Sequence, residues 1–226
     1  MNMNINIKNI IQTWKTKDIP EHYQKLVDNV KSNNTHWNYM FFDDNDIEVF
    51  VKTKMPKYYN VYTHLPQKIQ KIDFFRYLAI YYYGGVYLDL DIQLTKPLDD
   101  LYYDSPNICK FPIEIQNATD HLLVSQNFPK LIGNYAFYSP PKHPFILKII
   151  ENIECQRIST ENIRIAQEEN SDAPSQVHVY CTTGPVLVTQ TYIDNSEMSI
   201  ILLNPTTTSN NCFGDYGKHL CYGSWK

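Results

Sequence analysis

One segment, residues 66–91, constrains the fold of this 226-residue chain more than any other. Its first part, residues 66–83, has the clearest helical pattern in the sequence. Gly84 and Gly85 follow at once, and they matter because the chain has only seven glycines and none before this pair. Glycine allows a sharp turn, so we expect the helix to end here and the backbone to pass close to a ligand. Residues 86–89 then predict a strand that leads into two aspartates.

The order of the other expected elements favours an α/β sheet. The N-terminal part reads as strand, helix, strand and helix, over residues 9–14, 20–31, 36–42 and 43–52. This alternation is typical of parallel strand pairs. The second half is less regular, with strands expected at 134–139 and 199–203, helices at 144–153 and 185–192, and loop-like residues at 207–226. We expect a single domain over residues 1–226.

Composition excludes several classes of protein. Lys and Arg number 20 against 24 Asp and Glu, and no basic run offers a stripe of contacts to the phosphates of a nucleic acid. Hydrophobic residues make up 43% of the chain, and a chain of this length can bury a sizeable core. The five cysteines are odd in number and lack CxxC spacing, so we expect reduced thiols rather than disulfides or a zinc site.

The sequence shows no targeting or membrane-spanning segment. Residues 1–8 are polar and lack the apolar stretch of a signal peptide. The richest apolar window, residues 79–90, is too short and too interrupted by glycine to cross a bilayer. We therefore expect a soluble, cytoplasmic protein without a transmembrane segment.

Asp89 and Asp91 are the first candidates for chemistry. On a regular strand, residues two apart point to opposite faces, so both carboxylates can serve one ligand only if the strand ends and the chain bends. Such a pair at the carboxyl edge of a strand suits a hard divalent cation that also holds phosphate oxygens. In open α/β sheets, ligands bind at that edge. By itself, however, the triplet is equally compatible with two solvated surface aspartates.

The helix before the glycines adds a second charged pair. Asp73 and Arg76 lie one turn apart on the same helical face, among apolar residues, so we expect them near the core. A buried ion pair is not obviously more stable than apolar residues in its place. Its presence therefore indicates a functional role, such as presenting a hydrogen-bond donor to a sugar hydroxyl, although a structural helix salt bridge remains the alternative.

Together these motifs resemble a known family. Residues 73–91, DFFRYLAIYYYGGVYLDLD, are similar to the signature block of the DXD-containing sugar transferases of glycosyltransferase family 32. That family includes the fungal initiating mannosyltransferase and relatives of the bacterial glucosylating toxins. Weaker similarities follow in the family's order, at residues 10–15, 133–145, 182–192 and 219–225. The resemblance therefore covers nearly the whole chain.

The resemblance implies a fold and an activity. The fold is the GT-A type that binds nucleotide sugars, an α/β domain whose central mixed, mostly parallel sheet is flanked by helices. The activity is retaining transfer of a hexose from a nucleotide sugar, with a UDP-hexose favoured and GDP-mannose also compatible. Mn²⁺ or Mg²⁺ would be the cofactor, and the acceptor would be a hydroxyl of a glycan, protein or lipid. The absence of an anchor favours a viral or microbial origin.

The resemblance also assigns roles around the nucleotide and the metal. Trp14 would stack on the base, and Tyr87 would line the nucleotide pocket. Asp89 would contact both the ribose and the metal. Asp91 would be the main metal ligand, and His219 a further contact to metal or phosphate.

Other residues are assigned to the sugar and the diphosphate in the same way. Asp73 and Arg76 would hold the donor sugar, and Asn134 would approach its reacting centre. Ser224 and Trp225, in the C-terminal motif, would cover the diphosphate. No further carboxylate stands out beside Asn134, so we favour attack by the acceptor on the same face as the leaving group over a covalent intermediate.

Two other functions compete with this interpretation. Aspartyl-phosphate phosphatases also carry DxD at a strand end, but they normally have a small residue where Gln93 stands, and their motif lies in the first strand. A non-catalytic protein that binds carbohydrates or nucleotide sugars would fit the abundant aromatic residues. The intact acidic and basic motifs argue against it.

Overall fold

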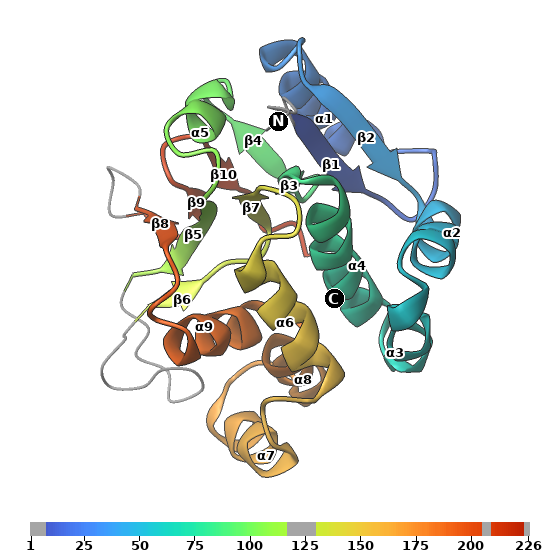
Figure 1. Cartoon of the computed structure of the whole chain (residues 1–226), viewed down its shortest axis with the longest axis vertical. Helices are drawn as coiled ribbons and strands as arrows, with labels where there is room; N and C mark the ends of the chain where they lie inside the picture. The colour runs from blue at the N-terminus through green and yellow to red at the C-terminus, as the bar shows by residue number, and fades with distance from the viewer. Residues whose placement is uncertain (1–7, 117–129, 205–208, 224–226) are drawn as a thin grey trace, which may run out of the picture.

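The computed structural model describes residues 8–116, 130–204 and 209–223, which form an α/β domain around a seven-stranded sheet (Figure 1). The sheet order is β2 (Asn38–Phe42), β1 (Asn9–Thr13), β3 (Gly85–Leu88), β7 (Ala136–Ser139), β5 (Cys109–Ile115) and β6 (Leu131–Ile132), with β8 (Ile200–Leu203) also paired to β5. Within these residues, β7 and β6 run opposite to the other five strands. The sheet is therefore mixed and mostly parallel, as expected.

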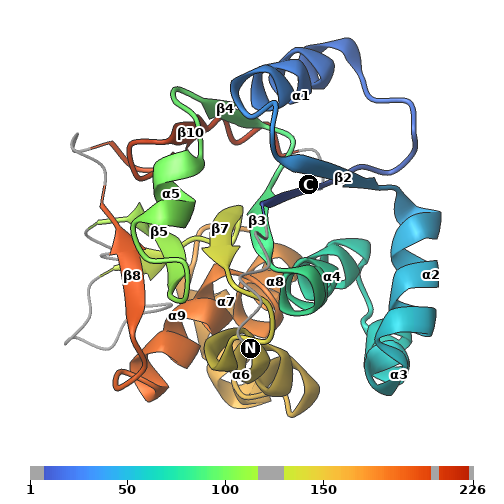
Figure 2. The ribbon, with the colours of Figure 1, turned by 45° about the horizontal axis from the view of Figure 1, so that its top comes forward.

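Helices cover both faces of this sheet, which is why its central strands are apolar on both sides. The side chain of Ile11 lies in the apolar cluster on one face of the sheet, and that of its neighbour Ile10 lies in the cluster on the other face. The first face is covered by α2 (Asp44–Lys54), the 3₁₀ turn η1 (Pro56–Tyr58), α3 (Tyr59–His64), α4 (Lys68–Tyr83), α6 (Pro144–Glu154) and α9 (Pro185–Asp194). The second face is covered by α1 (Glu21–Asn33), α5 (Asp99–Tyr103) and a small sheet (Figure 2).

Helix α4 is the central helix of the first face, and it is buried on nearly all sides. Gly84 ends it with φ of 67°, and Gly85 begins β3 with φ of 109°. A Cβ atom at Gly85 would overlap the backbone carbonyl of Asn9 in the adjacent strand β1. The glycine pair therefore lets β3 start directly after the helix and lie against β1. The close contact of Gly85 is with the backbone of β1 and not, as expected, with a ligand.

The C-terminal region differs from the loop that we expected. Its strands β9 (Cys212–Phe213) and β10 (Gly217–His219) join β4 (Ile92–Leu94) in a three-stranded sheet of order β4-β10-β9. Strands of two or three residues are too short to show an alternating pattern, and their pairing depends on contacts distant in the sequence. Helices α7 (Thr160–Glu169) and α8 (Pro174–Thr182) were also not expected, and they form a small core with the start of α9.

Among the described residues, no helix has both the length and the apolar character needed to cross a membrane.

The Gly85 contact yields a test of the fold. Gly85→Ala should lower the free energy of unfolding by about 3 kcal/mol, because the new methyl group meets rigid backbone and φ is positive. Gly214→Ala is the matched control: its φ is also positive, at 52°, but its Cβ would meet only the Leu203 side chain. Urea denaturation measures both, and equal losses would show that the contact with β1 is unimportant.

Candidate active site

The two aspartates of the DxD triplet lie on a turn and not on a continuous strand. Strand β3 ends at Leu88, and the backbone N–H of Ile92 donates to the carbonyl of Asp89 at 3.2 Å. The Leu90 side chain is buried in a separate apolar cluster with Tyr23 of α1. The strand therefore ends and the chain bends between the two aspartates, as the sequence analysis required, and both aspartates line the same pocket.

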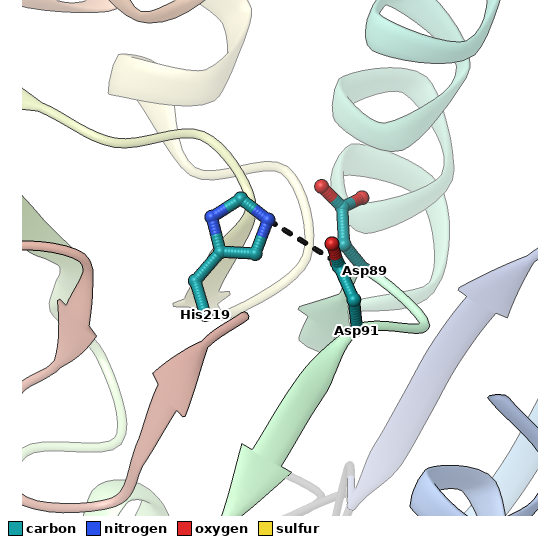
Figure 3. A group of neighbouring side chains, drawn as sticks. All are labelled: Asp89, Asp91 and His219. Carbon is teal, nitrogen blue, oxygen red and sulfur yellow. Dashed lines mark ion pairs between the residues drawn. The ribbon is translucent and has the colours of Figure 1, made fainter. Parts of the chain in front are cut away.

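His219 completes a group of three possible metal ligands. Strand β10 pairs antiparallel with β4 and sets His219 opposite Ile92. The Nε2 atom of His219 is 3.2 Å from Oδ1 of Asp91, and the imidazole ring stacks on Tyr135 with 4.4 Å between centroids. Figure 3 shows the ring facing the Asp91 carboxylate with Asp89 beside it. One ligand atom from each of the three side chains lies within 4.8 Å of the others.

The electrostatics of the two aspartates differ. Burial favours the neutral form of Asp91, but hydrogen bonds from His219 and from the backbone N–H of Tyr222 outweigh it and hold the pKa of Asp91 below its ordinary value. Burial lowers the pKa of His219, yet contact with Asp91 raises it overall. The pKa of Asp89 is raised by burial, which Arg76 only partly offsets.

Hydrogen bonds and an ion pair with neighbouring residues hold Asp89 in place. The Tyr87 hydroxyl donates to Oδ1 of Asp89 at 2.7 Å, and Nη2 of Arg76 lies 3.4 Å from the same oxygen. The backbone N–H of Asp89 donates to the carbonyl of Tyr135 at 2.7 Å. Tyr87 is fully buried, with its ring 4.7 Å from the Arg76 guanidinium carbon. It therefore reaches the site through Asp89.

Asp73 and Arg76 form a buried pair near the core, as the sequence indicated. Each is 3% exposed, and Nη2 of Arg76 is 3.0 Å from Oδ1 of Asp73. The Thr183 hydroxyl donates to Oδ2 of Asp73 at 2.8 Å. Burial raises the pKa of Asp73 to about 6 even though Arg76 and Thr183 act in the opposite direction.

Asn134 belongs to the same network. Its Nδ2 donates to Oδ1 of Asp73 at 3.2 Å and to the Tyr77 hydroxyl at 3.0 Å, while its backbone carbonyl accepts from Nη1 of Arg76 at 2.7 Å. The Arg76 Nε, in contrast, is buried without a hydrogen-bond partner among the described residues. A buried donor without a partner is costly, so an acceptor that reached Nε would remove that cost.

A pocket of about 640 Å³ unites most of the residues that the sequence singled out. Its lining includes Trp14, Asp73, Arg76, Asp89, Asp91, Asn134 and His219. The Trp14 ring packs against Tyr23, with 4.6 Å between centroids, at the α1 side of the pocket. Gly223 also lines the pocket, whereas Ser224 and Trp225 lie outside the described residues.

Sequence reasoning missed three acidic residues of the pocket, Asp44, Asp172 and Glu114. Glu114, near the end of β5, lines the same pocket as Asn134, although no carboxylate had stood out there. Burial raises the pKa of the Glu114 carboxyl to about 7. No motif surrounds this residue, so its position could be found only once β5 was placed beside β7.

Comparisons with known proteins bear on the family and the fold. Residues 20–107 match the family model described as the glycosyltransferase sugar-binding region containing the DXD motif. The chain is 31% identical to inositol phosphoceramide mannosyltransferase 1 of Schizosaccharomyces pombe, over 64% of this chain and 41% of that protein. It thus spans only about two fifths of that relative's length. An initiation-specific alpha-1,6-mannosyltransferase of Candida albicans is 32% identical over 45% of this chain and 28% of its own length.

A viral protein is similar to this chain over almost its entire length. An uncharacterized glycosyltransferase of Acanthamoeba polyphaga mimivirus, L373, is 35% identical over 97% of this chain and 84% of its own length. Among solved structures, the PaToxG glycosyltransferase has a TM-score of 0.51 and 16% identity, and covers 84% of this chain and 70% of its own. The catalytic domain of Clostridium novyi alpha-toxin also has a TM-score of 0.51, at 10% identity. That match covers 94% of this chain and 77% of the toxin domain. The fold is therefore of the GT-A glycosyltransferase type, and the chain belongs to the family of glycosyltransferases that contain the DXD motif.

Proposed function

We propose that this protein transfers a hexose from a nucleotide sugar to an acceptor hydroxyl, with retention of configuration and with a divalent metal. One observation carries this proposal: the Asp89–Asp91–His219 group and the buried Asp73–Arg76 pair line the same pocket. A metal site alone would fit many enzymes. A metal site beside a buried array of sugar-binding groups fits a sugar nucleotide.

The three ligands favour Mn²⁺. Carboxylates suit both Mg²⁺ and Mn²⁺. Mg²⁺ is bound mainly by oxygen atoms, so the imidazole of His219 favours Mn²⁺. Asp91 is the main ligand in this proposal because His219 and Tyr222 keep it ionised. Tyr87 and Arg76 orient Asp89 as the second ligand. When bound, the metal supplies positive charge that stabilises the departing diphosphate.

The donor sugar lies over the Asp73–Arg76 pair in this proposal. Arg76 is fixed by three carbonyl or carboxylate partners, and its buried Nε has no hydrogen-bond partner among the described residues. No described residue donates to the side-chain oxygen of Asn134, which leaves it available to a sugar hydroxyl. Because Asp73 is held by Thr183, Asn134 and Arg76, we favour same-face attack over a covalent intermediate on Asp73.

Trp14 is proposed to stack on the base at the α1 side of the pocket, where it lies against Tyr23. A UDP-hexose stays our favoured donor, and the names of the fungal relatives support GDP-mannose as the second. The mimivirus relative supports a viral or microbial origin.

A donor panel tests the function directly. UDP-glucose, UDP-galactose, UDP-N-acetylglucosamine and GDP-mannose are each added with and without Mn²⁺, and thermal unfolding and release of free nucleotide are measured. We expect one donor to raise the Tm only with the metal, since saturation at about 100 times the Kd stabilises a protein by roughly 2.7 kcal/mol. Stabilisation without nucleotide release would instead indicate a non-catalytic binding protein.

Asp91→Asn should abolish metal-dependent donor binding in calorimetry and leave the fold intact, because the amide cannot replace the anionic ligand. Asp215→Asn, on an exposed residue that does not line the pocket, is the control. Donor affinity equal to that of the wild type would remove Asp91 from the metal site.

Arg76→Lys should weaken binding of the nucleotide sugar far more than binding of the bare nucleotide. A lysine keeps the charge but cannot reach several partners at once as the planar guanidinium does. Arg164→Lys, on the exposed face of α7, controls for the substitution itself. Equal losses for both ligands would place Arg76 outside the sugar subsite.

A further inference from the structure

The Glu114 carboxylate stands apart from the other acidic groups of the pocket. No residue in the described part of the chain donates a hydrogen bond to it or forms an ion pair with it. Every other carboxylate that lines the pocket has such a partner: Asp44 with Lys68, Asp73 with Arg76, Asp89 with Tyr87, Asp91 with His219, and Asp172 with Tyr180. A partly buried carboxylate without a partner is costly, so Glu114 is available to a ligand.

The backbone turns Glu114 toward the pocket. Between β5 and β6 the register slips: Ile113 faces Ile132 and Ile115 faces Leu131, so Glu114 is an extra residue on β5. Bulges of this kind re-aim side chains and are common beside active sites. Consistent with the slip, the consecutive residues Glu114 and Ile115 both line the pocket.

Gly133 makes the space that the Glu114 carboxylate occupies. A Cβ atom at position 133 would lie 3.2 Å from Oε2 of Glu114 and still closer to the ring of Tyr135. The backbone carbonyl of Glu114 is held by the N–H of Asn211 at 2.9 Å. The carboxylate thus has a defined position on the sheet side of the pocket.

The charges around Glu114 indicate what it binds. The pocket's lysines and arginine lie elsewhere: Lys68 is paired with Asp44, Arg76 with Asp73 and Asp89, and Lys15 lies beside Trp14. Near Glu114 the described lining offers the phenols of Tyr135 and Tyr180, the carboxylates of Asp172 and Asp89, and the imidazole of His219. Three carboxylates against one imidazole disfavour a phosphate here, whereas carboxylates accept hydrogen bonds from hydroxyls and phenol rings pack on sugar rings.

We propose that Glu114 binds the acceptor, and that the acceptor is an uncharged carbohydrate whose hydroxyls donate to the Glu114 carboxylate. This inference rests on the proposed glycosyl transfer, because it assigns the donor sugar to the Asp73–Arg76 pair and leaves Glu114 to the acceptor. It distinguishes this protein from a transferase that acts on a phosphorylated polyol, which would need a cation where Glu114 and Asp172 lie.

The test uses the donor identified by the panel with Mn²⁺ and three acceptor probes: methyl α-D-mannopyranoside and lactose, which are neutral, and myo-inositol 1-phosphate, which is anionic. We expect transfer to a neutral probe in preference to the inositol phosphate. Glu114→Gln should raise the KM for the neutral probe by about tenfold or more, the effect of losing hydrogen bonds to a charged group. Its KM for the donor, its rate of donor hydrolysis and its Tm should not change.

Glu154→Gln, on the exposed end of α6, is the matched control, and Glu114→Ala repeats the test if the glutamine variant is unstable. Preference for inositol phosphate, or a Glu114→Gln variant with wild-type acceptor kinetics, would overturn the proposal. Loss of donor hydrolysis together with transfer would also overturn it, because Glu114 would then act on the donor. Failure of the wild type to release nucleotide from every donor would instead count against the proposed function.

Discussion

The buried guanidinium of Arg76 is the interaction on which the site depends. It connects helix α4, through Asp73, to the turn after β3, through Asp89, and to the backbone carbonyl of Asn134 just before β7. A buried charge is tolerated only when it is paired and hydrogen-bonded, and the planar fork of arginine can bond several partners at once. These three elements are therefore fixed relative to one another at the edge of the sheet where the pocket lies.

A second constraint comes from the C-terminal sheet. Strand β10 brings His219 to Asp91 by pairing with β4, and the backbone N–H groups of Leu220 and Tyr222 donate to the carbonyl and carboxylate of the same aspartate. Asp91 is thus held by residues from the far end of the chain. The metal group is consequently assembled by tertiary pairing, although two of its three members are neighbours in the sequence.

Much of the site could be predicted because its residues are local. Asp73, Arg76, Asp89 and Asp91 lie within one segment, and helix periodicity, a glycine pair and a strand end are local signals. Burial of the Asp73–Arg76 pair also followed from its apolar neighbours. Glu114 could not be predicted, because a bulge on β5 and a glycine on the following segment determine its direction. Thr183 could not be predicted either, because its hydroxyl bonds Asp73 on a helix far away in the sequence.

The sequence by itself determined the helix–glycine–strand segment, the parallel pairing of the first strands and the family resemblance. The reason is that steric preferences of the backbone and the spacing of apolar side chains act over a few residues. Only the tertiary structure decided that the C-terminal strands form a sheet with β4, that His219 joins the aspartates, and that Glu114 shares their pocket. Those outcomes depend on hydrogen bonds between distant strands, whose register no short stretch of sequence contains.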